Sequence, residues 1–227
     1  MTWHNLLKRL LKSRAGVAMT EFALGAPVLM FAGLYGIEQA NYVMVNMKIS
    51  QLATHLADNA SRIGDTSQLK NRKIYETDIN DVIVGGQIQG GPNVNIYANG
   101  RVFISSLEVD DNGEQYIHWQ RCRGAKAVSS GYGTQGDKVE GMGASKNLIT
   151  AEAGDAVIFV EVRYTYQPLI AGSIVPNREL RSIAAFNVRD SRDLTQIYQR
   201  NPSSPDPVQS CSSYAGEVKL NSAGVVS

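Results

Sequence analysis

The residues of this chain whose types and spacing could do chemistry lie near its start, in the stretch Gly16-Val17-Ala18-Met19-Thr20-Glu21-Phe22. Glu21 places a carboxylate at the head of an otherwise apolar segment, just after a basic leader. An ionised carboxylate inside a bilayer costs about a few kcal/mol, and less near the interface, where it can reach headgroups or water. We therefore expect Glu21 to be neutralised by a partner. The alternative is that Glu21 rests at the inner interface, solvated by headgroups.

Patterns for other chemistry are sparse. The chain has three histidines, His4, His55 and His118, and no two of them have the spacing of a metal-binding pair. A G-x-S-x-G nucleophile motif does not occur. These observations predict a protein that is not an enzyme and that has no metal site and no cofactor.

The segment Gly131–Gly136 matches the pattern G-x-G-x-x-G of dinucleotide-binding proteins. Such a site needs a strand before it and a helix after it. Here Ser129-Ser130 precede the pattern and a Gly-rich loop follows it, so we expect no nucleotide to bind.

An apolar run without a charged residue extends from Phe22 to Ile37. The first 16 residues contain no acid and four basic side chains, which are Lys8, Arg9, Lys12 and Arg14. This asymmetry predicts one membrane span with the N-terminus in the cytoplasm and the rest of the chain outside. The leader holds four of the 22 basic residues, so the chain after Gly16 carries 18 basic against 21 acidic residues, or net −3. That balance favours no nucleic-acid partner.

The apolar run is short for a membrane span. Its 16 residues cover roughly 24 Å as a helix, against a hydrocarbon core of roughly 30 Å. The helix is therefore predicted to continue through Glu38, Gln39 and Asn41 to Met47, with these polar groups near the outer interface or against a neighbour. Three small residues, Ala32, Gly36 and Ala40, are spaced four residues apart, which predicts a ridge on which another helix can pack closely. The alternative is that these residues face lipid.

A cleaved secretory signal peptide is disfavoured. The segment Glu38-Gln39-Ala40, which follows the apolar run, has a charge where a small residue is needed for cleavage. Beyond the span, apolar residues recur at spacings of three, four or seven, which predicts that the helix continues as a stalk to a stop at Gly64. They are Tyr42, Val45, Ile49, Leu52, Leu56 and Ile63.

After Gly64 the pattern becomes mixed and predicts an α+β fold. We expect a helix over 78–88, a hairpin of strands 101–109 and 115–122, a half-buried strand over 155–166, and a strand over 181–188. The stretch 125–145 is Gly- and Ser-rich, and the prolines at 202–207 precede an expected flexible tail. The predicted architecture is a long N-terminal membrane helix that continues into a stalk and packs on a small antiparallel sheet.

The chain has two cysteines, Cys122 after a predicted strand and Cys211 in the tail. In an oxidising compartment outside the cell membrane, such a pair is more often a disulfide than a reactive or metal-binding site. A disulfide would tie the C-terminal segment to the sheet. Two free thiols are the alternative.

The spacing of Gly16 and Glu21-Phe22 resembles the processing site of type IV prepilins of the tight-adherence (Flp) branch. The segment Glu21-Phe22-Ala23-Leu24-Gly25-Ala26-Pro27 resembles the start of TadE-like pilus assembly proteins. Pro27 also stands where that family usually has a proline. The D-x-S-x-S motif of the larger TadG-type relatives is missing.

This resemblance implies a pilin-like fold and a pseudopilin of the bacterial inner membrane with a periplasmic C-terminal domain. A prepilin peptidase would cut between Gly16 and Val17, and Glu21 and Phe22 would act in assembly. The implied division is a leader at 1–16, a transmembrane and stalk helix at 17–64, and a periplasmic domain at 65–227. Implied partners are other pilins and pseudopilins, the inner-membrane assembly platform and membrane lipid. The alternative is a permanently anchored periplasmic binding or scaffold protein with an uncut leader.

Overall fold

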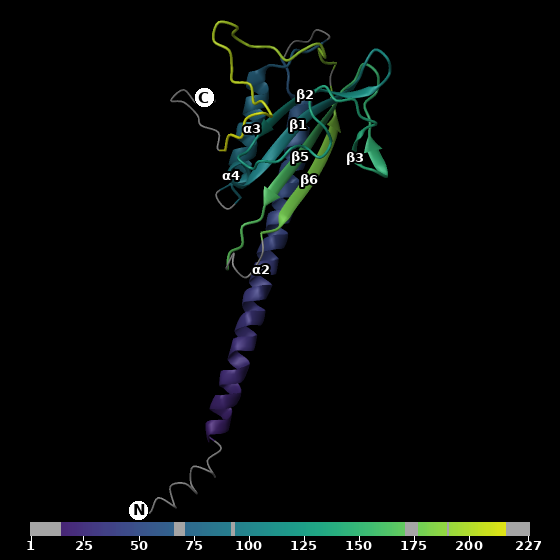
Figure 1. Cartoon of the computed structure of the whole chain (residues 1–227). Helices are drawn as coiled ribbons and strands as arrows, with labels where there is room; N and C mark the ends of the chain where they lie inside the picture. Colours follow the sequence, from purple (N-terminus) through teal and green to yellow (C-terminus); the bar gives the residue numbers. More distant parts are fainter. Residues whose placement is uncertain (1–14, 66–70, 92–93, 171–176, 190, 217–227) are drawn as a thin grey trace, which may run out of the picture. The chain divides into compact units, whose positions relative to one another are not determined.

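The structure is a computed structural model that describes residues 15–65, 71–91, 94–170, 177–189 and 191–216 (Figure 1). The four basic side chains of the predicted leader and His4 lie outside the described residues. The chain forms two compact units, which are treated separately below. The helical unit comprises Met1–Val43 and Pro168–Pro176, and the sheet unit comprises Met44–Gln167 and Asn177–Ser227.

The predicted long helix is present as α2, Ala15–Arg62, and it is continuous through Pro27. Its last turns belong to the sheet unit and bury the apolar stripe that the spacing predicts, with Val45, Ile49, Leu52 and Leu56 all buried. The helix ends two residues before Gly64. Within the described residues, this is one helix that is long and apolar enough to cross a membrane.

The second helix, α3, spans Glu76–Gly90 and starts earlier than the sequence predicts. The predicted first residue, Asp78, lies in the first turn and accepts a hydrogen bond from the backbone N–H of Tyr75 at 3.1 Å. A Cβ on Gly86 would lie 2.9 Å from Leu56, so this glycine lets α3 approach α2 closely. The short α4, Ile96–Asn99, is joined to α3 by a hydrogen bond from the Tyr97 hydroxyl to the carbonyl of Ile83, at 2.8 Å.

A four-stranded antiparallel sheet forms the centre of this unit, with the order β2-β1-β5-β6. The predicted hairpin is confirmed, because β1 and β2 pair across a turn at Asp110–Gly113. In Figure 1 the lower turns of the sheet unit's part of α2 pass behind the sheet, on the same side as α3. The strands are β1 (Gly100–Val109), β2 (Gln115–Arg123), β5 (Val157–Thr165) and β6 (Glu179–Asn187).

The expectation of a half-buried strand over 155–166 is wrong, because β5 is buried on both faces. Glu161 is 1% exposed and forms an ion pair with Arg181 at 2.9 Å. The reason is a covering segment, residues 125–151, that packs on the face away from the helices. Its Tyr132 ring lies edge-on to Phe159, with ring centroids 4.8 Å apart. This segment also contains a small hairpin that the sequence did not predict, β3 (Met142–Ala144) and β4 (Asn147–Ile149).

The C-terminal segment is fastened to β2 up to Gly216. A disulfide joins Cys122 to Cys211, the pairing that the sequence predicts. The backbone N–H of Cys122 donates to the carbonyl of Gln209 at 2.8 Å, and that of Gly124 donates to the carbonyl of Ala215 at 2.9 Å. Residues 217–227, the end of the expected flexible tail, lie outside the described residues.

Candidate assembly site

The first turn of α2 contains Gly16 and Val17, the two residues of the predicted cleavage site. Both are exposed and helical. A Cβ on Gly16 would meet no heavy atom within 4 Å. Within the described residues, packing therefore does not require a glycine at this position.

Glu21 and Phe22 lie one turn further along the helix, and both are exposed, Phe22 at 72%. Among the described residues, the Glu21 carboxylate takes part in no ion pair or hydrogen bond. Glu21 lies four residues after Val17, so the two side chains project from the same face of the helix. In the same turn the hydroxyl of Thr20 donates to the carbonyl of Val17 at 2.8 Å.

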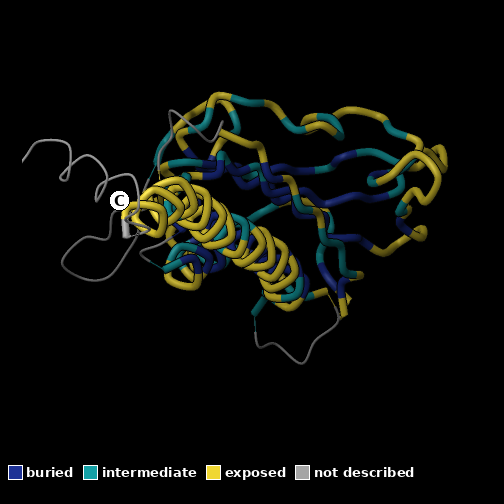
Figure 2. The backbone as a smooth tube through the Cα atoms, turned by 90° about the horizontal axis from the view of Figure 1, so that it is seen from below, coloured by how far each residue is buried: buried dark blue, intermediate teal, exposed yellow. Residues whose placement is uncertain are grey.

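The surface around Glu21 is strongly apolar. In the most apolar 18-residue stretch of α2, no residue is buried, and Figure 2 shows this part of the helix as exposed. The predicted packing ridge, Ala32, Gly36 and Ala40, is exposed along its whole length. An apolar surface of this extent indicates a membrane or protein partner. Its large exposed side chains are Val17, Met19, Phe22, Leu24, Val28, Leu29, Met30, Phe31, Leu34, Tyr35 and Ile37.

The charge-free run of α2 is followed by a buried carboxylate. Glu38 is 1% exposed and accepts hydrogen bonds from the backbone N–H groups of Leu169 at 3.1 Å and Ile170 at 3.2 Å. The sequence predicts a neighbour for Glu38 but does not identify it, because the loop lies 131 residues away along the chain. The uncharged, Pro-flanked loop sequence was the only available signal.

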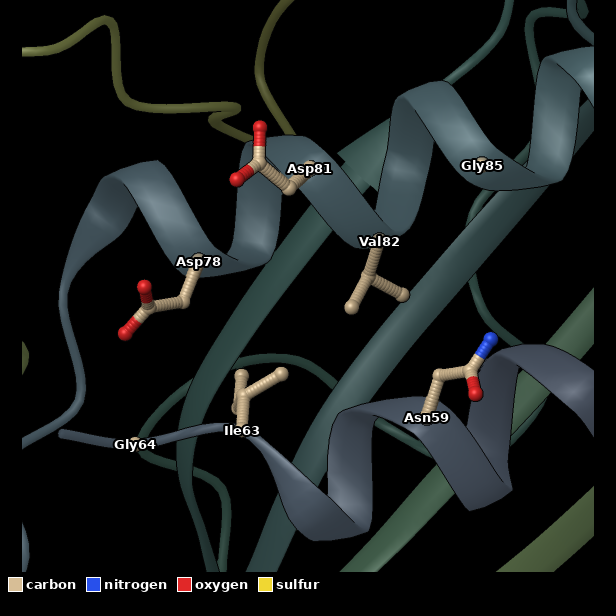
Figure 3. A pocket seen from close by; sticks show the side chains of 7 residues that line it. All are labelled: Asn59, Ile63, Gly64, Asp78, Asp81, Val82 and Gly85. Carbon is tan, nitrogen blue, oxygen red and sulfur yellow. The ribbon is translucent and has the colours of Figure 1, made fainter. Parts of the chain in front are cut away.

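A surface groove of about 360 Å³ lies between the end of α2 and α3 in the sheet unit (Figure 3). Asp78, Asp81 and Val82 line it from α3, and Asn59 and Ile63 line it from the other helix; Val82 points toward α2, whereas Asp81 points away from it. Burial, and then the charge of Asp78, raise the pKa of Asp81. Asp78 is already engaged by Arg200 at 2.6 Å. Among the described residues, no group of three or more His, Cys, Asp or Glu side chains is arranged to hold a metal ion.

The G-x-G-x-x-G segment at Gly131–Gly136 forms turns within the covering segment. The N–H of Gly131 donates to the buried carboxylate of Glu161 at 3.0 Å. A carboxylate at this position would repel a phosphate group. This geometry differs from a dinucleotide site, in which a helix N-terminus faces the phosphates.

His118 is placed by a β-bulge. The register shifts from Ser106 opposite Trp119 to Leu107 opposite Ile117, so His118 is the extra residue on β2. Its Nδ1 lies 2.8 Å from a carboxylate oxygen of Glu108, which is 2% exposed. The other described histidine, His55, is exposed on α2.

The His118 and Glu108 pair predicts a pH-dependent stability. The hydrogen bond to Glu108 raises the pKa of His118, burial opposes that shift, and the negative charge of Glu108 adds to it. A raised pKa in the folded state means that the stabilisation is complete below the ordinary value of about 6.5 and is lost as the pH rises through the folded-state value. When the pH is raised from about 6 to about 8.5, the free energy of unfolding of the wild type should fall relative to that of His118→Gln. Denaturant titrations of both proteins at the two pH values would measure this difference.

His55→Gln is the matched control for this measurement. It should keep the pH dependence of the wild type, because His55 is exposed. If His118→Gln and wild type respond equally to pH, the two side chains are not coupled in solution.

No family model, curated protein or solved structure matches this chain.

Proposed function

We propose that this protein is a pseudopilin of the TadE-like type, an assembly subunit for tight-adherence type IV pili. One observation carries the proposal: the described part of α2 starts at Ala15 with Gly16 in its first turn, and it presents an exposed apolar surface with a carboxylate, Glu21, that has no partner among the described residues. A helix of this kind is suited to pass from lipid into a bundle of similar helices. It belongs in a bacterial inner membrane, with the basic leader in the cytoplasm and the sheet unit in the periplasm.

The open surroundings of Gly16 support cleavage after this residue. Glycine disfavours a helix by about 1 kcal/mol relative to alanine, so the first turn is easily opened to an extended strand. An extended backbone without a side chain can enter the cleft of a prepilin peptidase. Because no neighbour among the described residues fills the space beside Gly16, packing within that part of the chain does not account for this glycine.

Cleavage gives Glu21 a chemical role. The new α-amino group of Val17 is a cation at the start of an apolar helix, where the helix dipole disfavours positive charge. The carboxylate of Glu21 on a neighbouring pilin or pseudopilin would neutralise it. Exposure of both Val17 and Glu21 on one helix face leaves them accessible for this contact.

The first test is the N-terminus of the protein extracted from membranes of cells that contain the prepilin peptidase. We expect sequencing to begin at Val17 for wild type and at Met1 or Thr2 for Gly16→Leu, because the leucine side chain blocks the peptidase cleft. The fraction of protein that keeps its leader should rise from nearly none in wild type to nearly all in Gly16→Leu.

Gly25→Leu is the matched control for this test, since Gly25 is also helical and also has no neighbour within 4 Å of its Cβ position. It should be cut like wild type. An intact leader on the wild-type protein in these cells would overturn the pseudopilin assignment and favour a permanently anchored periplasmic binding or scaffold protein.

A further inference from the structure

Two exposed apolar side chains lie beside the point where α2 becomes polar. Leu169 is 65% exposed and Ile170 is 38% exposed. Their backbone N–H groups both donate to the carboxylate of Glu38, at 3.1 and 3.2 Å. Residues Pro168–Pro176 belong to the same compact unit as the apolar part of α2 rather than to the sheet unit.

The carboxylate of Glu38 therefore serves a local structural purpose. Two backbone donors satisfy it, and the exposed fraction of the residue falls to 1%. Two donors that would otherwise face an apolar environment are satisfied at the same time. The outcome is that Leu169 and Ile170 point outward while the polar groups of helix and loop face each other.

The contact of Glu38 with the backbone of Leu169 and Ile170 lies at the end of the charge-free run, which is too short to cross a hydrocarbon core. The charge-free run ends at Ile37, roughly 6 Å short of the thickness of a hydrocarbon core. Glu38 is the next residue, so Leu169 and Ile170 lie beside the end of the charge-free run, and α2 exposes further apolar side chains after it at Val43, Met44 and Met47. The chain from Tyr166 to Asn177, between β5 and β6, contains no charged residue.

We propose that Leu169 and Ile170 insert into the lipid leaflet at the C-terminal end of the span, so that the membrane-embedded surface consists of α2 and this loop together. Glu38 is the positioning residue that holds the loop at that depth. The occupant of this apolar surface is lipid, because the surface is continuous with the span itself. The inference depends on α2 crossing a membrane, which the proposed function also requires, and it is independent of leader cleavage.

Tryptophan quenching by brominated lipids tests the proposal. The full chain carrying Leu169→Trp is reconstituted into phosphatidylcholine vesicles, with bromine atoms either near the headgroups or deep in the acyl chains. We expect the fluorescence of the introduced tryptophan to be quenched mainly by the bromines near the headgroups. Its emission maximum should lie at a shorter wavelength in vesicles than in denaturant without detergent. Wild-type protein supplies the background of Trp3 and Trp119.

Two control variants separate the possible failures. Met30→Trp, at a residue 67% exposed within the apolar run, should be quenched by the deep bromines. Leu148→Trp, at a residue 41% exposed in the sheet unit, should not be quenched. Quenching of Met30→Trp without quenching of Leu169→Trp would overturn the loop proposal alone. Absence of both would overturn the span and, with it, the proposed function.

A second substitution tests whether Glu38 positions the loop. Adding Glu38→Ala to Leu169→Trp removes the acceptor of both N–H groups, so most of the shallow quenching should be lost. Unchanged quenching in the double variant would mean that the tryptophan draws the loop into lipid by itself, and it would overturn the positioning role. Asn46→Ala, at an exposed position two turns further along α2, should leave the quenching unchanged.

Discussion

Replacing Arg101 by methionine is expected to lower the free energy of unfolding by about 3 kcal/mol or more. Arg101 is fully buried, and its guanidinium donates to three backbone carbonyls. These are the carbonyls of Gly124 at 2.9 Å, Ser213 at 3.0 Å and Cys211 at 2.7 Å. Methionine fills a similar volume but has no donor, so these buried carbonyls would lose their partners.

The location of Arg101 explains why the loss should be large. The guanidinium lies 4.2 Å from the ring centroid of Tyr214, so it joins β1 both to the end of β2 and to the C-terminal segment. Without it, the disulfide, the backbone pairing with β2 and the hydrogen bonds from Arg123 to Gln209 and Gly216 would remain to hold that segment. A domain has a total stability of about 5–15 kcal/mol, so this loss is a substantial share of it.

Chemical denaturation of the full chain in detergent, followed by the fluorescence of Trp119, would measure the effect. Arg62→Met is the control, because Arg62 has a side chain 52% exposed and pairs with Asp58 within the same helix. It should change stability by about 0.5 kcal/mol or less. Equal stabilities of the two variants would show that Arg101 does not hold the C-terminal segment in solution.

Replacing Glu21 by alanine should abolish most pilus assembly while leaving the leader correctly cut. Breaking an ion pair that is shielded from water costs about 3–5 kcal/mol, which is more than about a hundredfold in an association equilibrium. Under the proposed function the peptidase would act at Gly16 and Val17, one turn away, so the cut should be unaffected. Glu21 has no partner among the described residues, so folding should be unaffected as well.

Pilus counts by electron microscopy, together with N-terminal sequencing of the same cells, would measure both effects. Glu152→Ala removes an exposed carboxylate from the sheet unit and should assemble like wild type. Glu21→Asp keeps the charge on a shorter side chain and should restore part of the assembly. Normal pilus numbers in Glu21→Ala would contradict the pairing role and favour the interpretation in which headgroups solvate Glu21.

Local patterns predicted much of the fold because they depend on neighbours in the sequence. The stripe through Ile49, Leu52 and Leu56 predicts the buried face of a helix, and the turn at Asp110–Gly113 predicts the hairpin. The pairing of Cys122 with Cys211 followed from there being only two cysteines. The expectation of a half-buried β5 was wrong, since Glu161 is polar and yet buried beneath the covering segment, residues 125–151, which precedes the strand in the chain.

The sequence by itself determined that this protein has one apolar helix with a basic start, a carboxylate at its head and an α+β region after it, because composition and periodicity act over short distances. Only the tertiary structure decided which polar groups are buried and what they contact. Glu38 meets Leu169 and Ile170, and Arg101 meets Cys211 and Ser213, each across more than 100 residues. Such contacts depend on how strands and loops return to one another, which no local spacing encodes.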